Sequence, residues 1–107
     1  MRLTISNAME QLKGHDRPFK TLFGHGTLEV EFYKPDKVDQ QTPHTRDEIY
    51  VIAAGSGTFV FADQRSPCEV GEVLFAPAGL EHRFVDFTDD FATWVFFYGP
   101  EGGEATM

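Results

Sequence analysis

Three side chains in this sequence are of the types that bind metal ions in proteins. His44 precedes Glu48 by four residues in the stretch PHTRDEIYVIAAGSG, and His82 follows a Pro-x-Gly turn further along the chain. Two imidazoles and one carboxylate form a three-ligand set with open positions, which suits Fe(II), Mn(II), Ni(II) or Zn(II). We therefore take His44, Glu48 and His82 as the candidate metal ligands.

The spacing between His44 and Glu48 restricts the backbone that can carry both. Residues four apart in an extended strand are separated by about 13 Å, whereas each ligand must approach the metal to roughly 2.0–2.2 Å. The two side chains can therefore share one metal only if the backbone between them forms a helix or reverses its direction. The run EIYVI is rich in β-branched and aromatic residues, which disfavours a helix. We expect His44 to end one strand and Glu48 to begin the next, on either side of a polar turn.

Strand alternation places further side chains beside these candidates. Tyr50 lies two residues after Glu48, and therefore on the same face of an extended strand. We expect its phenol to act in proton transfer, as the candidate catalytic group. The same alternation predicts a pocket lined by Ile52, on the Glu48 face, and by Phe84 and Asp86, on the His82 face.

The elements that must position these residues are short and mostly extended. In Thr27–Lys34 (TLEVEFYK) apolar side chains alternate with two glutamates, which is typical of a half-buried strand. Ser6–Leu12 predicts a short helix, capped by Ser6 or Asn7 and ended by Gly14. Many short strands between turn residues, without helical crossovers, predict an all-β antiparallel sandwich or barrel. The other expected strands are Glu48–Ala54, Thr58–Ala62, Val73–Ala76, His82–Phe87 and Phe91–Tyr98.

Length and charge limit the organisation and the partners of the chain. Its 107 residues predict one domain with a single core, and its formal net charge of −8 disfavours phosphate backbones and anionic membrane surfaces. No apolar run approaches the roughly 18 residues of a membrane helix, and the N-terminus lacks the apolar core of a secretory signal. The single cysteine, Cys68, permits no intrachain disulfide. We expect a cytoplasmic protein without nucleic-acid or membrane partners.

Two stretches of the chain resemble the two motifs of the cupin superfamily. The second motif, G-x5-P-x-G-x2-H-x3-N, is matched at every spacing but ends on Asp86 in place of Asn; its matching residues are Gly71, Pro77, Gly79 and His82. The first motif, G-x5-H-x-H-x3,4-E-x6-G, is matched in part, by His44, Glu48 and Gly55. The resemblance extends over residues 27–98 and is to small single-domain, conserved-barrel cupins of bacterial type.

This resemblance implies a double-stranded β-helix (jelly-roll) barrel of antiparallel strands, commonly a homodimer, with a divalent metal in its mouth. It divides the single domain, 1–107, into an N-terminal extension (1–26), a core barrel (27–98) and a C-terminal tail (99–107). It also brings His82 to His44 and Glu48, which their spacing alone does not do.

The first motif departs from the family pattern where a ligand is expected. Thr42 stands in the place of the first histidine, and Asp36 in the place of the initial glycine. A set reduced by one imidazole is expected to bind its ion more weakly and to be partly empty. Weak or water-mediated oxygen ligands could come from Gln40, Gln41 or Thr42. The alternative is a barrel that has lost its metal, in which Glu48 and the two histidines bond to each other.

Three functions are compatible with this reading. The first is a metal-dependent enzyme, an oxygenase or an isomerase or lyase, that acts on a small organic molecule inside an apolar barrel. The second is a module that binds a small ligand without turnover. The third is a metal-free barrel whose homodimer is the function. The fold by itself does not establish any of these activities.

Overall fold

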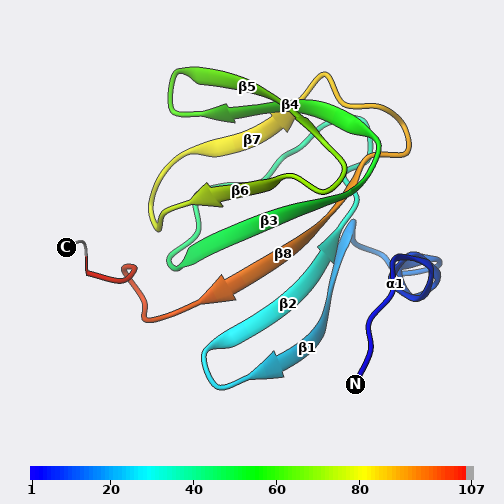
Figure 1. Cartoon of the computed structure of the whole chain (residues 1–107), viewed down its shortest axis with the longest axis horizontal. Coiled ribbons are helices and arrows are strands. Elements are labelled where there is room, and N and C mark those ends of the chain that lie inside the picture. Colours follow the sequence, from blue (N-terminus) through cyan, green and yellow to red (C-terminus); the bar gives the residue numbers. More distant parts are fainter. Residues whose placement is uncertain (106–107) are drawn as a thin grey trace.

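The computed structural model describes residues 1–105 and arranges their strands in two antiparallel sheets (Figure 1). The larger sheet has the order β1-β2-β8-β3-β6, and the smaller sheet has the order β5-β4-β7. This arrangement confirms the predicted all-β barrel of jelly-roll type. The elements are α1 (Ile5–Leu12), β1 (Phe19–His25), β2 (Leu28–Tyr33), β3 (Asp47–Ala54), β4 (Ser56–Phe61), β5 (Gln64–Glu69), β6 (Val73–Ala76), β7 (His82–Val85) and β8 (Ala92–Tyr98). Within residues 1–105, no helix combines the length and the apolar character that crossing a membrane requires.

The N-terminal helix begins earlier than its sequence predicts. Thr4 is the N-cap, because its backbone is extended and its Oγ1 accepts a hydrogen bond from the amide of Asn7 at 3.0 Å. The predicted caps, Ser6 and Asn7, are therefore wrong, since both lie inside α1. Ala8 is buried and anchors the helix against the larger sheet beside Phe32.

Two strands have no counterpart among the predicted ones. β1 pairs with β2 from Phe19 opposite Tyr33 to His25 opposite Leu28, so part of the expected N-terminal extension joins the larger sheet. β5 carries polar residues and Pro67, which weaken a strand pattern. Its place at the edge of the smaller sheet explains why proline is tolerated there, because an edge strand has one side free of ladder hydrogen bonds.

β2 was correctly predicted as a strand, but both of its faces are covered. Phe32 packs in a cluster with α1, on the side of the sheet away from the barrel interior. Tyr33 instead belongs to the interior cluster, and Glu31, two residues before it, faces the same way into a cavity. The glutamates of β2 therefore line the inside of the barrel. Apolar and acidic residues do alternate along β2, but this alternation does not determine which of the two faces is exposed to solvent.

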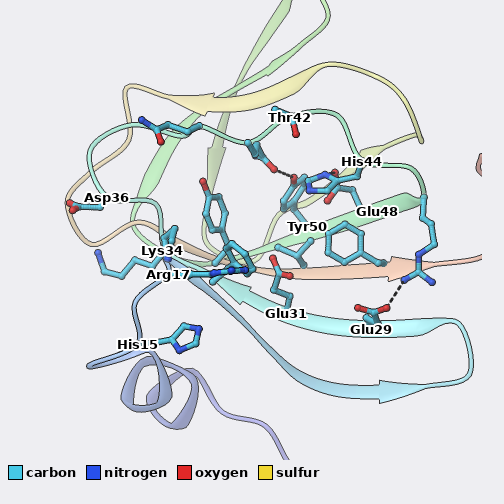
Figure 2. A pocket seen from close by; sticks show the side chains of 18 of the residues that line it. His15, Arg17, Glu29, Glu31, Lys34, Asp36, Thr42, His44, Glu48 and Tyr50 are labelled. Atoms are coloured by element: carbon cyan, nitrogen blue, oxygen red, sulfur yellow. Dashed lines mark hydrogen bonds and ion pairs between the residues drawn. The ribbon is translucent and has the colours of Figure 1, made fainter. Parts of the chain in front are cut away.

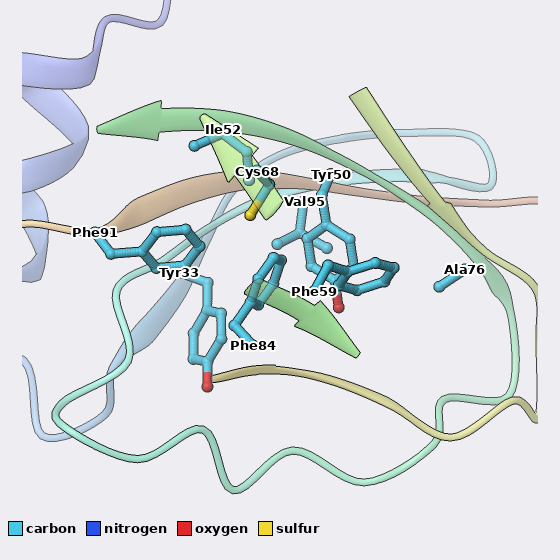
Figure 3. Close-up of a cluster of buried hydrophobic side chains, with 9 residues drawn as sticks. All are labelled: Tyr33, Tyr50, Ile52, Phe59, Cys68, Ala76, Phe84, Phe91 and Val95. Carbon is cyan, nitrogen blue, oxygen red and sulfur yellow. The ribbon is translucent and has the colours of Figure 1, made fainter. Parts of the chain in front are cut away.

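The barrel interior is filled mainly by aromatic side chains from both sheets (Figure 3). Tyr50 of β3 makes an edge contact with Phe84 of β7, with ring centroids 5.0 Å apart, and Phe84 also lies against Phe91 at 4.8 Å. Aromatic pairs of this kind add to the stability gained from burial alone. The interior cluster consists of Tyr33, Tyr50, Ile52, Phe59, Cys68, Ala76, Phe84, Phe91 and Val95.

The chain passes from one sheet to the other at Gly55, between β3 and β4. Gly55 has φ +70, and a Cβ at this position would lie 2.4 Å from Thr88 Oγ1 and 2.8 Å from the Cα of Phe91. Both the backbone conformation and the lack of space require glycine here. Its match to the last position of the first motif therefore has a structural reason.

Candidate metal centre

The side chains of His44, Glu48 and His82 converge inside the barrel. One ligand atom from each lies within 4.8 Å of the others. Glu48 Oε1 is 3.0 Å from His44 Nδ1 and 2.5 Å from His82 Nε2. The structure thus brings together three residues that lie up to 38 positions apart in the sequence, from one strand of each sheet and from a loop.

Two of these residues are placed by strands that belong to different sheets. Glu48 lies in β3 of the larger sheet, where it pairs with Phe97 on one side and Ala76 on the other. His82 lies in β7 of the smaller sheet, where it pairs with Phe61. The two side chains are each 1 % exposed. They meet because the two sheets face each other across the barrel interior.

His44 is held differently, and the prediction that it ends a strand is wrong. It lies in the irregular segment between β2 and β3. Its carbonyl accepts a hydrogen bond from the amide of Gly79 at 2.8 Å, and its ring lies edge-on to Phe97 with centroids 5.0 Å apart. The Pro-x-Gly turn that precedes His82 therefore also fastens His44. The His44 side chain remains 35 % exposed.

The hydrogen bonds of His82 define which of its nitrogens faces the centre. Nδ1 donates to the carbonyl of Leu80 at 2.8 Å, which directs Nε2 toward Glu48 and toward the hydroxyl of Tyr50 at 2.9 Å. A backbone acceptor on one nitrogen is the usual way in which a protein orients the other nitrogen toward a metal.

The charges of Glu48 and His82 support each other in the metal-free protein. Burial by itself raises the pKa of Glu48, but hydrogen bonds from His44 and His82 outweigh it and leave that pKa lowered. Burial likewise lowers the pKa of His82, and the bonds to Glu48 and Leu80 reverse this and raise it. Burial raises the pKa of Tyr50 well above its usual value, and the Glu48 charge adds to the effect, so the phenol keeps its proton at neutral pH.

The donor set fits a divalent ion with small adjustments. An ion with bonds of about 2.0–2.2 Å spans ligand atoms up to about 4.4 Å apart, close to the spread of 4.8 Å in this cluster. Glu48 Oε2 is buried and has no hydrogen-bond partner among the described residues. A buried carboxylate oxygen without a partner is costly. An ion bound here would give that oxygen, or the pair of oxygens, a partner.

A cavity of about 1010 Å³ opens beside the cluster (Figure 2). His44, Glu48 and Tyr50 contribute to its wall, and so does Phe97. Charged side chains surround its opening, and two of the basic ones are already engaged: Arg46 pairs with Glu29 at 3.4 Å, and Lys34 donates to the carbonyl of Asp89 at 2.6 Å. The volume is that of a small-molecule site.

The residues expected to line the pocket lie in three different environments. Ile52 and Phe84 are 1 % exposed within the aromatic interior and do not reach the cavity wall. Asp86 follows β7 with φ +51 and is exposed, so the structure does not bring it to the centre. The three suggested weak ligands do line the cavity: Gln40, Gln41 and Thr42. Of these, Gln41 is bonded to Tyr50 and the other two are exposed.

Two acidic residues near the centre were missed by the sequence analysis. Glu31 projects into the cavity from β2 (Figure 2), and burial raises its pKa to about 7. The aromatic Tyr33, two residues later, was the signal that this face points inward. Asp39 is 6 % exposed and its carboxylate accepts several hydrogen bonds. Its only sequence signal is the Asp-x-Gln turn pattern, which is weak.

The chain matches the model of a known protein family, and its fold is similar to those of many solved structures. The profile of the Cupin domain family matches residues 29–98. A curated relative, an uncharacterised protein of Streptomyces coelicolor, is 32% identical over 63 residues, which cover 59% of this chain and 60% of that protein. The matched part is thus less than two thirds of the relative's length.

Several solved structures share the fold. A cupin-2 domain protein from Shewanella frigidimarina superposes with a TM-score of 0.71 at 17% identity, over 91% of this chain and 94% of that one. The DMSP lyase DddQ from Ruegeria pomeroyi superposes with a TM-score of 0.67 at 24% identity, over 92% of this chain and 55% of that one. A mannose-6-phosphate isomerase homologue from Ralstonia eutropha superposes with a TM-score of 0.69 at 16% identity, over 80% of this chain and 87% of that one. These identities establish likeness of fold.

Proposed function

The chain belongs to the Cupin domain family, and from that premise we propose that it binds a divalent metal ion through His44, Glu48 and His82 and acts there on a small organic molecule. The observation that carries this proposal is the convergence of the three side chains around a buried carboxylate whose Oε2 has no partner among the described residues. Fe(II), Mn(II), Ni(II) and Zn(II) all suit two imidazoles and a carboxylate.

The reaction class we propose is that of an oxygenase or of an isomerase or lyase. A divalent ion bound here supplies a Lewis acid that polarises a substrate oxygen. The protein contributes a cavity with Phe97 in its wall, and the buried phenol of Tyr50, whose oxygen is 2.9 Å from His82 Nε2. The Tyr50 hydroxyl lies between Gln41 Oε1, to which it donates, and His82 Nε2, and it is the candidate group for proton transfer; its raised pKa means that the phenol holds its proton at neutral pH.

Metal content is the first test of the proposal. We expect protein purified without chelators to carry up to one ion per chain, and titration with Zn²⁺ to fill the remainder. His44→Ala should reduce binding, whereas His25→Ala is the matched control, because His25 is exposed at the end of β1 and outside the cavity wall. The proposal of a metal-dependent function would be contradicted if the protein contained no metal and if His44→Ala left its melting temperature unchanged.

Substrate turnover is the second test. Oxygen consumption by the loaded protein against small phenols, thiols and diketones tests the oxygenase reading, and product analysis of the same mixtures tests isomerase or lyase chemistry. Tyr50→Phe should keep the metal and lose turnover. A compound that raises the melting temperature without being converted would instead identify a binding module.

A metal-free barrel is the second candidate, and one observation favours it. Glu48 already accepts hydrogen bonds from both His44 and His82, so most of the cluster is satisfied without an ion. The unpartnered Glu48 Oε2 is what this reading leaves unexplained. The metal analysis above separates the two candidates.

We also propose that two copies of the chain associate through the outer side of β6. This strand forms an edge of the larger sheet, and Val73 and Phe75 on it are 65% and 49% exposed. They continue across the sheet to Val51 and Ile49, their partners on β3. An exposed edge strand offers unpaired backbone groups to the same strand of a second copy, related by a two-fold axis. Light scattering should give the mass of a dimer, and Phe75→Glu should give that of a monomer.

A further inference from the structure

The C-terminal tail folds back onto the end of the barrel that contains the candidate metal centre. It leaves β8 at this end, where β3 begins and where β6 leads into β7 (Figure 1). The amide of Gly102 donates to the carbonyl of Thr45 at 2.6 Å. Thr45 directly follows His44, so the tail contacts the segment that carries the most exposed of the three candidate ligands.

Asp47 joins this tail to the turn that precedes His82. Asp47 is only 5% exposed, and both oxygens of its carboxylate accept a hydrogen bond. Oδ1 accepts from the amide of Ala78, in the Pro-x-Gly turn, at 2.9 Å, and Oδ2 accepts from the amide of Glu104, in the tail, at 2.8 Å. A carboxylate has two acceptor oxygens, so it can satisfy both amides at once.

The turn that Asp47 binds also holds His44. The amide that follows Ala78 in the turn is that of Gly79, and it donates to the carbonyl of His44 at 2.8 Å. Two successive amides of one turn therefore bond to the two ends of the segment His44–Asp47. Because this segment starts outside the strands, turn bonds of this kind help to set the distance between His44 and Glu48.

Gly103 allows the tail to approach Asp47 closely. Its φ is +90, and a Cβ at this position would lie 2.9 Å from Asp47 Oδ1 and 3.1 Å from the Cβ of Ala78. A larger residue would therefore push the tail away from Asp47 and Ala78. Gly102 has nearly the same φ, +89, but a Cβ on it would face open space among the described residues. The two neighbouring glycines thus differ in their contact with Asp47.

We propose that Asp47 is a positioning residue of the metal centre: held by the C-terminal tail, it fixes the Pro-x-Gly turn, and this turn keeps His44 beside Glu48. The inference rests on the proposed metal-binding function and adds a determinant that lies outside the ligand set. Within residues 1–105, the Asp47 carboxylate bonds only to the amides of Ala78 and Glu104, so it acts on His44 through the backbone of the turn.

The test compares two tail variants, with Zn²⁺ affinity as the readout. Gly103→Ala and Gly102→Ala add the same methyl group at nearly the same backbone conformation and leave the charge of the protein unchanged. We expect Gly103→Ala to bind Zn²⁺ about tenfold more weakly, at the lower end of the effect of outer partners of metal ligands. Gly102→Ala has the same backbone strain without the clash and should stay close to the wild type. Equal affinities of the two variants would overturn the inference.

Asp47→Asn tests whether the tail acts through Asp47. The side chain of Asn has one acceptor oxygen, so it cannot accept from both Ala78 and Glu104. In this background Gly103→Ala should cost little further affinity, because the connection that it breaks is already broken. The comparison is made within one background, so the loss of a charge near the ion cancels. An equal loss in both backgrounds would mean that the tail acts by another route, and would overturn the inference.

Hydrogen exchange in the metal-free protein gives a second readout, which also decides the question if Asp47→Asn fails to fold. Exchange followed by NMR reports the local opening of single amides. We expect the amide of Gly79, which donates to His44, to exchange faster in Gly103→Ala than in Gly102→Ala. The amides between β4 and β7 should keep their protection. Faster exchange throughout both sheets would show a general loss of stability and would contradict a positioning role.

The same measurement separates this inference from the proposed function. If the Gly79 amide responds as expected but the wild type binds no Zn²⁺, the metal function fails and the positioning role stands. If the wild type binds Zn²⁺ and Gly79 exchanges at the same rate in both tail variants, the positioning role fails and the metal function stands.

Discussion

The candidate metal centre has two halves that the fold holds in different ways. In the strand half, Glu48 and His82 lie on hydrogen-bonded strands and are each 1 % exposed. In the loop half, His44 lies on an irregular segment and is 35 % exposed. The strand half is fixed by ladder register, which moves only if the sheets move. The loop half depends on a few side-chain and turn bonds, so changes there should alter affinity more than stability.

The largest effect should come from breaking the strand half. His82→Ala leaves the buried carboxylate of Glu48 with one partner in place of two. We expect the free energy of unfolding to fall by about 3 kcal/mol, because a buried charge that loses its partner is strongly destabilising. Metal binding should be abolished. Urea denaturation and elemental analysis measure the two effects; unchanged stability would contradict the idea of a tight buried pair.

Breaking the loop half should separate affinity from stability. His44→Ala removes one ligand, and we expect Zn²⁺ affinity to fall about 100-fold. The free energy of unfolding should change by less than about 1 kcal/mol, because the pair with Glu48 is partly exposed and Glu48 keeps His82. The same two measurements apply. A stability loss as large as that of His82→Ala would show that the halves do not differ.

Adding a ligand to the loop half should strengthen metal binding there. Thr42 lines the cavity two residues before His44, where the family motif has its first histidine. We expect Thr42→His to raise Zn²⁺ affinity about tenfold, or ~1.4 kcal/mol. Thr21→His is the control, since Thr21 is exposed on β1 and outside the cavity wall. Equal affinities for the two variants would mean that position 42 cannot reach the ion.

The smallest effect concerns Glu31 and depends on pH. Burial raises the pKa of Glu31 in the folded protein from 4.5 to about 7, so the folded state binds more protons than the unfolded state between these values. Stability contributed by this group is therefore lost as pH rises through that window. In metal-free protein, Glu31→Gln should be more stable than the wild type by about 1 kcal/mol at pH 8, after allowance for solvent screening, and equal at pH 4. Urea denaturation at both pH values tests this.

Much of the site followed from local sequence features. The turn between His44 and Glu48, the strand that begins beside Glu48 and the Pro-x-Gly turn before His82 depend on residues close together in the chain. Tyr50 falls on the Glu48 face because alternation along a strand is a property of the backbone. These features were predictable because neighbouring residues decide them.

The errors have a common origin in long-range packing. The direction that Glu31 faces depends on what covers the other face of β2, and that cover is α1, whose Ala8 packs on Phe32. Asp86 turns away because β7 ends before it, at Val85. Asp39 is buried at the edge of β7, where the amide of Phe84, 45 residues away, is one of its hydrogen-bond donors. The residue periodicity of a single segment carries no information about such contacts with distant segments.

Ligand types, the strand pattern and the family motifs of this protein can be read from its sequence. The meeting of β3 and β7 across one interior, which brings Glu48 to His82, depends on how the two sheets pack. The hydrogen bonds that join Asp39 to Gln41 and Gln41 to Tyr50 depend on the same packing. Alternation and turn chemistry act over a few residues, whereas the pairing of strands and the packing of sheets join residues that are far apart in the chain.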